Sequence, residues 1–332
     1  DRSPAARRPR PAQPVSVATT LALGLDTLLD RSVVLGYTSL GHRLRTTLPG
    51  WPADPGPDSL RGRDVIVTGA SSGLGIETAA TLASYGAHVH CVVRDPKKLD
   101  AIRDRLGDAD RITAWRCDLA SRSSVESFCG DFLASGRRLH AVVHNAGVMP
   151  ATHSLDGAGR ELSMVVHVLA PVLMTDLLAP ALDPGARVVF VTSGGMYAQA
   201  LRLDDLPYDE LPYRPSVAYA RSKRAQVELL GPLGGRWPSV QVYATHPGWA
   251  SSPGLDEGLP TFTRLLRPLL RQGRAGVDTT TWLVATEPAA PGGGLWHDRR
   301  ERPTSYVAAT RPSAAEREQL YAWVDEQVAR EN

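Results

Sequence analysis

Residues 64–75 have the sequence DVIVTGASSGLG, a short β-branched run followed by a turn of glycine and serine. The run 64–68 predicts a strand, and a helix is expected after the turn, up to about residue 83. Glycines between a strand and a helix allow a tight bend and let backbone N–H groups approach a pyrophosphate at the helix N-terminus. Such a turn alone is a common loop, but its place after the first strand indicates nucleotide binding.

The alternation of strand and helix continues along the chain. Strands are predicted at 87–93, 112–117, 139–144, 186–192 and 240–245, and helices at 96–106, 121–134, 160–180 and 216–231. Strands that alternate with helices imply a parallel sheet covered on both faces. We therefore expect an α/β fold, a doubly wound Rossmann-like parallel sheet that forms one dinucleotide-binding catalytic domain over residues 61–300.

Two segments precede this domain. Residues 1–14 are rich in proline and arginine and are predicted to be disordered. Residues 15–60 are expected to form one or two helices on the domain edge and a linker, WPADPGPD, at 51–58. For 15–48 the alternative is a peripheral contact with a membrane surface.

Beyond the domain, residues 301–332 are expected to contain an amphipathic helix at 313–329. Its apolar side would carry Leu320, Trp323, Val324 and Val328.

Composition limits the classes of function. The 332 residues are 42% hydrophobic and 22% charged, with a net charge of +2, so bulk electrostatics do not indicate a nucleic-acid partner. The nine histidines show no metal-binding spacing, and we expect no metal site. Cys91, Cys117 and Cys129 are odd in number and form no C-x-x-C pair, which favours buried free thiols and a reducing, cytoplasmic location. The sequence contains no run of about 18 apolar residues, so we predict no membrane-spanning helix.

Tyr219-Ala220-Arg221-Ser222-Lys223 is the candidate for proton chemistry. Residues four apart share one face of a helix, so the Tyr219 phenol and the Lys223 ammonium should lie one turn apart. A neighbouring cation is expected to lower the pKa of a phenol from about 10 and to make it a usable acid or base for carbonyl and alcohol substrates. Tyr-x-x-x-Lys also occurs by chance, but lysine is found only at 97, 98 and 223 in an arginine-rich chain, which indicates a need for a compact ammonium.

Together these motifs resemble those of the short-chain dehydrogenase/reductase superfamily over about residues 62–300. The shared motifs, in order, are TGASSGLG (68–75), NAG (145–147), Ser193, YARSK (219–223) and HPGW (246–249). Within the superfamily the chain is most similar to retinol-dehydrogenase-like members, on TSGGMY (192–197), HPGWASSPG (246–254), GLWHDRRERPTS (294–305) and an N-terminal LLDRSVVLGY. The resemblance implies an oxidoreductase that interconverts a carbonyl and an alcohol on a small, hydrophobic molecule.

The resemblance also implies roles for individual residues. Tyr219 would be the acid/base, Lys223 would bind the nicotinamide ribose, and Ser193 would hydrogen-bond the substrate carbonyl. Ser193 could instead cap the following turn. Contacts to the cofactor are expected from Gly69, Ser71, Ser72, Gly73, Leu74, Gly75, Arg94, Asp118, Leu119, Asn145, Ala146, Gly147, Tyr219, Lys223, Pro247 and Gly248. Asp118 could also serve as an aspartate near a helix N-cap.

Arg94 bears on cofactor choice. An acidic residue about 20 positions after the glycine turn would bind the 2′-OH of NAD, but Arg94 stands nineteen positions after Gly75. A guanidinium suits the 2′-phosphate of NADP. Asp95 is the competing candidate, and Arg94 could also be a solvated charge at a strand end. We predict a preference for NADP(H), with NAD(H) as the alternative.

Two histidines depart from the family pattern. His167 stands where these enzymes usually have the asparagine that opens a helix to a water in the proton relay, and His144 replaces the first asparagine before Ala146-Gly147. We expect His167 to lie near Lys223 and to act as a catalytic group in its neutral form. These changes also favour a rival function, a dinucleotide-binding regulatory protein with little turnover.

A flap over the substrate is expected near 251–275, which is apolar on one side and rich in arginine on the other. It could be a lid for a bulky substrate or a surface helix broken by Pro268. The chain could also form a homo-oligomer, which the sequence does not decide.

Overall fold

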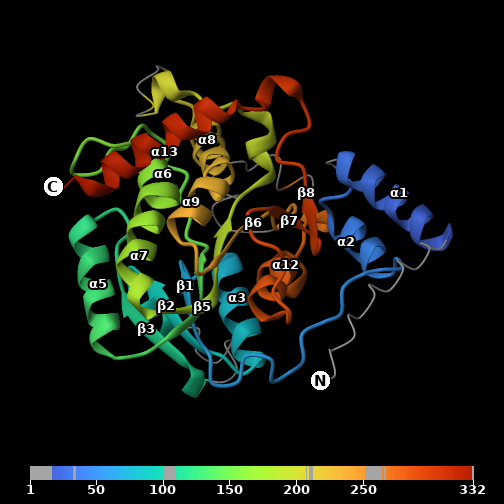
Figure 1. Ribbon diagram of the computed structural model, residues 1–332, viewed down its shortest axis with the longest axis horizontal. Helices are drawn as coiled ribbons and strands as arrows, with labels where there is room; N and C mark the ends of the chain where they lie inside the picture. Colours follow the sequence, from blue (N-terminus) through green and yellow to red (C-terminus); the bar gives the residue numbers. More distant parts are fainter. Residues whose placement is uncertain are drawn as a thin grey trace, which may run out of the picture.

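The computed structural model describes residues 17–32, 35–100, 109–206, 208, 212–250, 264 and 267–330. Its centre is an eight-stranded sheet with helices on both faces (Figure 1). The strands are β1 (Asp64–Thr68), β2 (His88–Val93), β3 (Ile112–Arg116), β4 (Leu139–His144), β5 (Leu182–Val191), β6 (Gln241–Thr245), β7 (Leu295–His297) and β8 (Arg300–Arg302). The six predicted strands are confirmed, and β5 begins four residues earlier than the predicted residue 186.

The order of the strands is β3-β2-β1-β4-β5-β6-β7-β8. All neighbours are parallel except β7 and β8. The chain winds outward from β1 in one direction and then from β4 in the other, so the order reverses between β1 and β4. In such sheets a ligand binds beyond the carboxyl ends of the strands at this reversal. The doubly wound fold is therefore confirmed, and the candidate site should lie just after Thr68 and His144.

The hairpin of β7 and β8 was not predicted. Each strand has three residues, and β8 has the charged sequence RER, which lacks the apolar alternation of a typical strand. The two turn residues, Asp298 and Arg299, have φ values of 50° and 52°. Two positive φ values give the hairpin turn that matches the twist of the strands, although arginine rarely adopts that conformation.

Helices cover the two faces of the sheet (Figure 1). One face carries α3 (Gly73–Ser84), α4 (Lys97–Asp100) and α12 (Arg274–Ala285); the other carries α5 (Arg122–Ala134), α6 (Leu162–Met164), α7 (Ala170–Leu178), α8 (Pro215–Glu228) and α9 (Leu230–Arg236). On β1, Val65 and Val67 are buried in the first core, between the sheet and α3, α4 and α12, whereas Ile66 is buried in the second core, on the opposite face. Side chains alternate between the two faces of a strand. Residues 101–106 of the predicted helix 96–106 lie outside the described residues.

Two other predictions about the core are confirmed. The C-terminal helix α13 (Ala314–Ala329) buries Leu320, Val324 and Val328 against the second core, with Trp323 packed at its edge. The three cysteines are free and buried. Burial raises the pKa of the Cys91 thiol to about 12, so this group stays protonated and unreactive.

The helix expected at 160–180 is interrupted by a π-helical segment, Val165–Leu169, between α6 and α7. Within the described part of the chain, Leu162–Ala181 is long and apolar enough to cross a membrane by length and composition. However, 78% of this window is buried inside the protein, as in a helix that fills a core. The sequence analysis had predicted no apolar segment of membrane-spanning length, and Leu162–Ala181 is such a segment.

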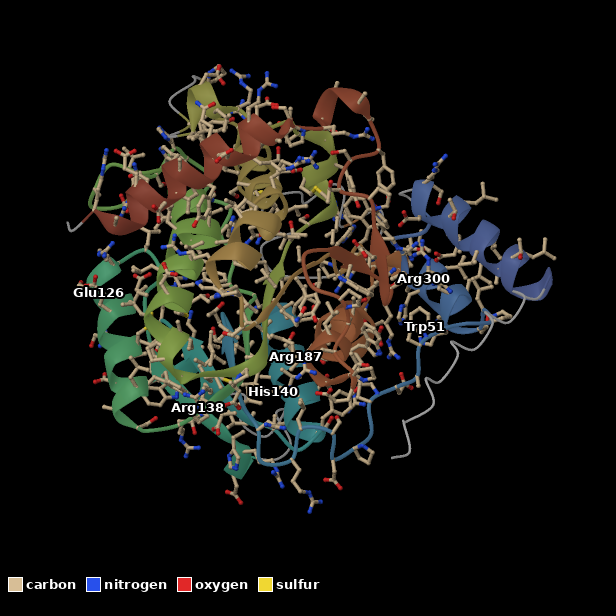
Figure 2. All side chains as sticks on the ribbon, viewed as in Figure 1. Trp51, Glu126, Arg138, His140, Arg187 and Arg300 are labelled. Carbon is tan, nitrogen blue, oxygen red and sulfur yellow. The ribbon has the colours of Figure 1, made fainter. Side chains whose placement is uncertain are left out.

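The N-terminal extension forms two helices, α1 (Val17–Arg31) and α2 (Ser39–Thr46), beside β7 and β8, which confirms the predicted helices at the domain edge (Figure 1). Figure 2 labels Trp51 and Arg300 near this junction. Arg45 is buried and donates to Asp26 Oδ1 (2.8 Å) and to Asp298 Oδ2 (2.6 Å). The extension is thus joined to the domain by buried ion pairs. The predicted disorder of 1–14 concerns residues outside those described.

Candidate active site

Tyr219 and Lys223 lie one turn apart on α8, next to the carboxyl end of β5. Lys223 Nζ donates to the carbonyl oxygen of Val191, the last residue of β5, over 2.8 Å, and lies 5.6 Å from the centre of the Tyr219 ring. Thr192 Oγ1 donates to the carbonyl oxygen of Lys223 over 2.9 Å. These two bonds fix α8 against the end of β5, so the predicted proximity of the two side chains is confirmed.

The protonation of this pair differs from the sequence-based prediction. Burial lowers the pKa of Lys223 to about 7, so its ammonium is only partly charged at neutral pH. Desolvation raises the pKa of Tyr219, and a hydrogen bond with Ser193 opposes that increase. The expectation that Lys223 lowers the Tyr219 pKa was therefore wrong for this arrangement, because burial of the phenol has the larger effect. The group that does favour the phenolate is Ser193.

Ser193 lies two residues after the end of β5 and contacts both Gly195 and Tyr219. Its Oγ accepts a hydrogen bond from Gly195 N–H over 3.3 Å at the start of the short helix Gly194–Ala198. The capping alternative for Ser193 is thus present together with its contact to Tyr219. A serine hydroxyl can accept one bond and donate another, so both can hold at once.

His167 lies in the π-helical segment, and its ring meets the Tyr219 ring edge to face at 5.3 Å between centroids. The predicted proximity to the Tyr219–Lys223 pair is confirmed. Nε2 accepts from Val148 N–H (2.9 Å), which leaves Nδ1 to donate to Ser222 Oγ (2.7 Å). Burial, and then Lys223, holds the pKa of His167 well below its usual range, so the ring is neutral.

These contacts change the role expected for His167. Both ring nitrogens are committed to protein partners, and the His167 carbonyl oxygen accepts from Gln226 Nε2 over 2.7 Å. Ser222 Oγ, which accepts from His167 Nδ1, in turn donates a hydrogen bond to the carbonyl oxygen of Tyr219 (2.8 Å). His167 therefore holds the backbone of Tyr219 and cannot use a free ring nitrogen to relay a proton. Ser222 and Gln226 belong to this arrangement, and sequence analysis missed both.

The glycine turn has the shape of a phosphate cradle. Gly69 has φ +67°, and a Cβ there would lie 2.8 Å from Ala146 Cα; a Cβ on Gly75 would lie 2.2 Å from the carbonyl oxygen of Gly69. Ser72 is the extended N-cap of α3 and makes no side-chain capping bond, and the first turn of α3 has no acidic residue. Backbone N–H groups and serine hydroxyls at a helix N-terminus suit an anion, so these residues fit the phosphates of a dinucleotide.

Asn145 joins the turn to β4. Its side-chain Nδ2 donates to the carbonyl oxygen of Thr68 (3.0 Å), and Thr68 Oγ1 accepts from the N–H groups of Asn145 (3.1 Å) and Ala146 (3.0 Å). These bonds bring the predicted Asn145-Ala146-Gly147 motif against the predicted turn 68–75. A Cβ on Gly147 would lie 3.3 Å from His167 Nε2 and 4.0 Å from Lys223 Nζ, so the same motif also borders the Tyr219–Lys223 pair.

The residues that would meet the adenosine half are at the ends of β2 and β3. Arg94 is exposed immediately after β2, whereas Asp95 Oδ1 accepts from Lys97 N–H (3.1 Å) at the start of α4. Asp118 Oδ1 accepts from Ala120 N–H (3.0 Å), so its alternative role at a helix start is present, and Leu119 is buried beside it. The Asp95 carboxylate, which competes with Arg94 as the group facing the adenosine ribose, therefore already accepts a hydrogen bond from Lys97 N–H.

Pro247 and Gly248 form the turn after β6. Gly248 has φ +78°, and its N–H donates to His246 Nδ1 over 2.9 Å. His144, the other departure from the family pattern, is fully buried, and its Nε2 lies 2.8 Å from Thr175 Oγ1, away from the turn. Of the predicted flap, residues 251–263 and 265–266 lie outside the described residues, and the lid prediction stays untested.

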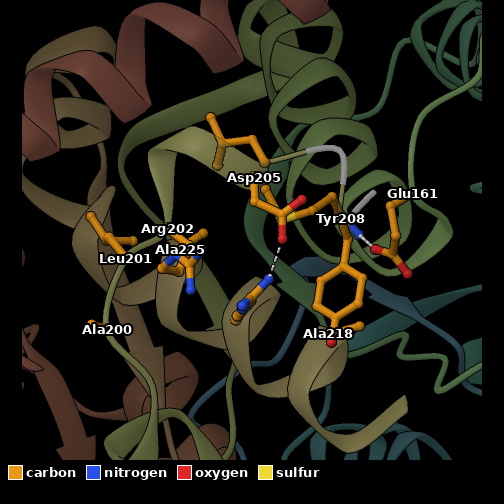
Figure 3. A pocket seen from close by; sticks show the side chains of 11 residues that line it. Glu161, Ala200, Leu201, Arg202, Asp205, Tyr208, Ala218 and Ala225 are labelled. Atoms are coloured by element: carbon orange, nitrogen blue, oxygen red, sulfur yellow. Dashed lines mark hydrogen bonds and ion pairs between the residues drawn. The ribbon is translucent and has the colours of Figure 1, made fainter. Parts of the chain in front are cut away.

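Figure 3 shows a different hollow on the other face of α8, with Asp205 and Tyr208 at its wall. Its volume is about 20 Å³, and Arg221 Nη1 donates to Asp205 Oδ2 inside it over 2.7 Å. That space holds about one water molecule. It is not where a substrate would bind.

Comparison with known proteins agrees with this geometry. Residues 63–202 match the family model described as short chain dehydrogenase. The chain belongs to the short-chain dehydrogenase/reductase family and is an oxidoreductase of that family. It is similar to human dehydrogenase/reductase SDR family member 12, with 32% identity over 81% of this chain and 87% of the relative.

Two further comparisons widen the picture. Human retinol dehydrogenase 12 is 32% identical over 78% of this chain and 84% of its own length. In fold, the chain is similar to a short chain dehydrogenase from Escherichia coli complexed with NADPH: TM-score 0.60, 23% identity, 74% of this chain and 100% of that one. The first relative supports the family, and the solved structure supports the fold.

Proposed function

We propose that this protein is an NADP(H)-dependent oxidoreductase that interconverts a carbonyl and an alcohol on a small hydrophobic molecule. The observation that carries the proposal is that Ser193, Tyr219 and Lys223 meet beside the end of β5, within a family of dehydrogenases. The bound nicotinamide supplies or accepts a hydride at the carbinol carbon. The protein supplies the proton and holds the oxygen.

In the reductive direction, Ser193 donates a hydrogen bond to the carbonyl oxygen and stabilises the negative charge that develops there. Tyr219 gives its proton to that oxygen, which becomes the alcohol, and the tyrosine is left as a phenolate. Its raised pKa suits the donor role, because the phenol keeps its proton at neutral pH until the substrate oxygen takes it. Lys223 would bind the hydroxyls of the nicotinamide ribose, and the Ser193 hydroxyl favours the phenolate.

Cofactor preference rests on Arg94. Its exposed guanidinium would form charge-assisted hydrogen bonds with the 2′-phosphate of NADP(H). Asp95, which could instead bind the 2′-OH of NAD, is engaged with Lys97 N–H. The turn residues Gly69 to Gly75 and Asn145 to Gly147 would hold the pyrophosphate and ribose. NAD(H) remains the alternative cofactor, to be separated from NADP(H) by binding measurements.

The test is consumption of NADPH with three carbonyl compounds of different shape: all-trans-retinal, decanal and cyclohexanone. We expect turnover with at least one of the two long apolar compounds, since relatives include a retinol dehydrogenase. Binding of NADPH is measured in parallel by quenching of tryptophan fluorescence. Binding without turnover over a broader carbonyl panel would contradict the proposal.

That outcome would support the second candidate, a dinucleotide-binding regulatory protein with little turnover. One observation favours it: the ring nitrogens of His167 and its carbonyl oxygen all have protein partners, so the relay that the family builds at this position is altered. The retained Ser193, Tyr219 and Lys223 favour the enzyme instead.

We also propose that the enzyme is cytoplasmic and that α1 makes a peripheral contact with membranes. Leu21 and Leu28 on α1 are 70% and 69% exposed, and Leu40 on α2 is 60% exposed, while Asp26 and Asp30 face inward. Exposed leucines on a surface helix can insert at the headgroup boundary. Flotation with phosphatidylcholine–phosphatidylserine vesicles should be lost in Leu21→Glu/Leu28→Glu and kept in Leu133→Glu, an exposed leucine on α5. Equal flotation of all forms, or none of the parent, would refute the contact.

A further inference from the structure

Tyr37 belongs to the N-terminal extension, but it is completely buried next to the candidate active site. Its carbonyl oxygen accepts from Trp249 N–H (2.8 Å) and from Arg271 Nε (3.0 Å). Trp249 directly follows the Pro247-Gly248 turn. A backbone group of the extension thus holds the chain just after the turn that would contact the nicotinamide.

The ring of Tyr37 reaches the same turn from a second direction. It meets the His246 ring edge to face at 4.3 Å between centroids, and His246 Nδ1 accepts the N–H of Gly248. The His297 ring contacts both of these rings, with centroid distances of 4.9 Å to Tyr37 and 4.6 Å to His246. The imidazole that accepts from Gly248 N–H is therefore packed against the rings of Tyr37 and His297.

The same ring also contacts the loop that carries Ser193. A Cβ on Gly194 would lie 3.2 Å from Tyr37 Cε2 and 2.7 Å from His246 Nε2. Gly194 has no side chain because its backbone already lies against these two rings. Since Gly194 directly follows Ser193, the Tyr37 ring limits how far the serine can retreat from Tyr219.

Tyr37 is itself rigidly held. The preceding carbonyl oxygen, of Gly36, accepts from Arg45 Nη1 (2.6 Å) and Arg271 Nη2 (3.1 Å), and both arginines are paired with the fully buried Asp298. A Cβ on Gly36 would lie 1.9 Å from the carbonyl oxygen of Leu29, so the segment leaves no room for another residue there. These contacts make the Tyr37 ring a fixed support for the loops above it.

We propose that Tyr37 is a positioning residue for the reaction, whose ring keeps the Ser193-Gly194 backbone and the Pro247-Gly248 turn in the geometry in which Ser193 meets Tyr219. This inference rests on the proposed oxidoreductase activity. It assigns to the N-terminal extension a part in catalysis through packing alone, because Tyr37 contacts neither substrate nor cofactor in this scheme.

The inference has a consequence for pH dependence. Oxidation of an alcohol needs Tyr219 as the phenolate, so the rate rises with pH as Tyr219 loses its proton. The hydrogen bond with Ser193 favours the phenolate, and its loss would move that rise to higher pH. Two titratable groups, Lys223 and His167, also face Tyr219, and a change at Tyr37 leaves both of them in place.

The experiment compares Tyr37→Leu and Tyr37→Phe with the parent. Among the described residues, the Tyr37 hydroxyl has no hydrogen-bond partner by geometry, although the Tyr197 and Tyr306 hydroxyls lie near it. Those two neighbours donate to Pro303 and Asp30 instead. Tyr37→Phe, which keeps the ring, should therefore retain the parent kcat and pH profile.

In Tyr37→Leu we expect kcat to fall about tenfold to a hundredfold, since a displacement of about 1 Å at a reacting group has that effect. The rise of alcohol oxidation should move to higher pH, measured with NADP⁺ and the alcohol of whichever test carbonyl the parent reduces fastest. The Kd for NADPH from fluorescence quenching should change much less than kcat, because the glycine turn is untouched. Should the leucine form fail to fold, Tyr37→Met, whose unbranched flexible side chain adapts to an irregular space, replaces it.

Phe132→Leu is the matched control. Phe132 is equally buried, but it lies on α5, where its ring packs on His90 and Trp115 of β2 and β3. It should lower the melting temperature without moving the pH profile. A parent with no turnover would refute the proposed function itself. An active parent, together with a Tyr37→Leu form that keeps its kcat and pH profile or changes only as Phe132→Leu does, would overturn the inference about Tyr37.

Discussion

Lys223 Nζ donates a hydrogen bond to the carbonyl oxygen of Val191, and together with the bond from Thr192 Oγ1 to the Lys223 carbonyl oxygen it links α8 to the end of β5. The bond from Nζ gives a reason for a lysine at this position in a chain that has only two others, Lys97 and Lys98. Burial leaves about 2% of Lys223 exposed, and a compact head group at the end of an apolar stem fits where a planar guanidinium would not. Tyr219, one turn earlier, is consequently placed by the sheet as well as by its own helix.

Replacement of Tyr219 by phenylalanine should abolish turnover and leave NADPH binding nearly unchanged. The substitution removes one hydroxyl, which is the proton donor, and retains the ring that packs on His167. Steady-state rates and fluorescence titration of NADPH measure the two effects separately. A phenylalanine variant that kept the parent kcat on any accepted carbonyl would show that another group transfers the proton.

Arg94→Ala should weaken the binding of NADPH and leave that of NADH almost unchanged. Only NADPH presents a 2′-phosphate to the guanidinium, and a hydrogen bond to a charged group contributes about 1.5–3 kcal/mol, or roughly tenfold to a hundredfold in Kd. Arg311, an exposed arginine just before α13, provides a control as Arg311→Ala. Equal losses for the two cofactors would remove Arg94 from cofactor selection.

His167→Leu should lower both the free energy of unfolding and kcat, whereas His167→Asn should keep much of both. Leucine leaves Val148 N–H without an acceptor and Ser222 Oγ without a donor, and each unpaired buried group costs about 1–3 kcal/mol. Asparagine can restore one acceptor and one donor. Urea unfolding and steady-state kinetics on the three forms provide the comparison, and identical behaviour of the leucine and asparagine forms would show that these two bonds are unimportant.

The protein should lose stability steeply as the pH falls below about 6.5. Burial lowers the pKa of five histidines: to about 4 for His140, to about 3 for His144 and His246, and well below 6.5 for His167 and His297. The unfolded chain binds protons that the folded chain does not, so stability is complete above the unfolded value and declines below it. Each histidine contributes about 1.4 kcal/mol per pH unit in that window.

His144→Asn tests this effect at one site. It should reduce the slope of unfolding free energy against pH by one such increment between about pH 6.5 and the folded value near 3. The measurement is urea unfolding at several pH values with the parent in parallel. Superimposable slopes for the two proteins would mean that His144 takes up its proton in the folded state as readily as in the unfolded chain.

Arg45→Met should destabilise the protein by about 3–5 kcal/mol, because it leaves Asp26 and Asp298 buried without one of their cationic partners. Arg43→Met, at an exposed position of the same helix, should change stability by less than about 0.5 kcal/mol. Urea unfolding again gives both values. A loss at Arg45 as small as that at Arg43 would show that the extension contributes little to the fold.

Local patterns in the sequence were sufficient to predict most of the sheet and the proximity of Tyr219 and Lys223. Strand β1 and the glycine turn are visible because β-branched residues and a glycine that needs φ +67° leave a direct trace in the sequence. Tyr219 and Lys223 could be paired because helical spacing fixes their relation. The π-helical segment around His167 could not be predicted, since its sequence, VVHVL, has the same apolar character as an ordinary core helix.

Properties that depend on tertiary surroundings were also beyond the sequence. The direction of the Tyr219 pKa shift follows from desolvation, which no residue spacing reveals. The contact of Tyr37 with His246 and Gly194 joins segments far apart in the chain, and the motif LLDRSVVLGY, which ends at Tyr37, does not indicate which residues its tyrosine touches. Likewise, the charges of β8 read as a surface segment until their partners on α1 are known.

The ion pair of Arg45 with Asp298 also sets an order of events during synthesis. The two residues are 253 positions apart, so at roughly 5–20 residues per second Arg45 leaves the ribosome at least about ten seconds before its partner is made. The ion pair of Asp26 with Arg302 likewise cannot form until Arg302 has been synthesised. The buried ion pairs that join the first two helices to the domain therefore cannot form until the hairpin of β7 and β8 has been synthesised.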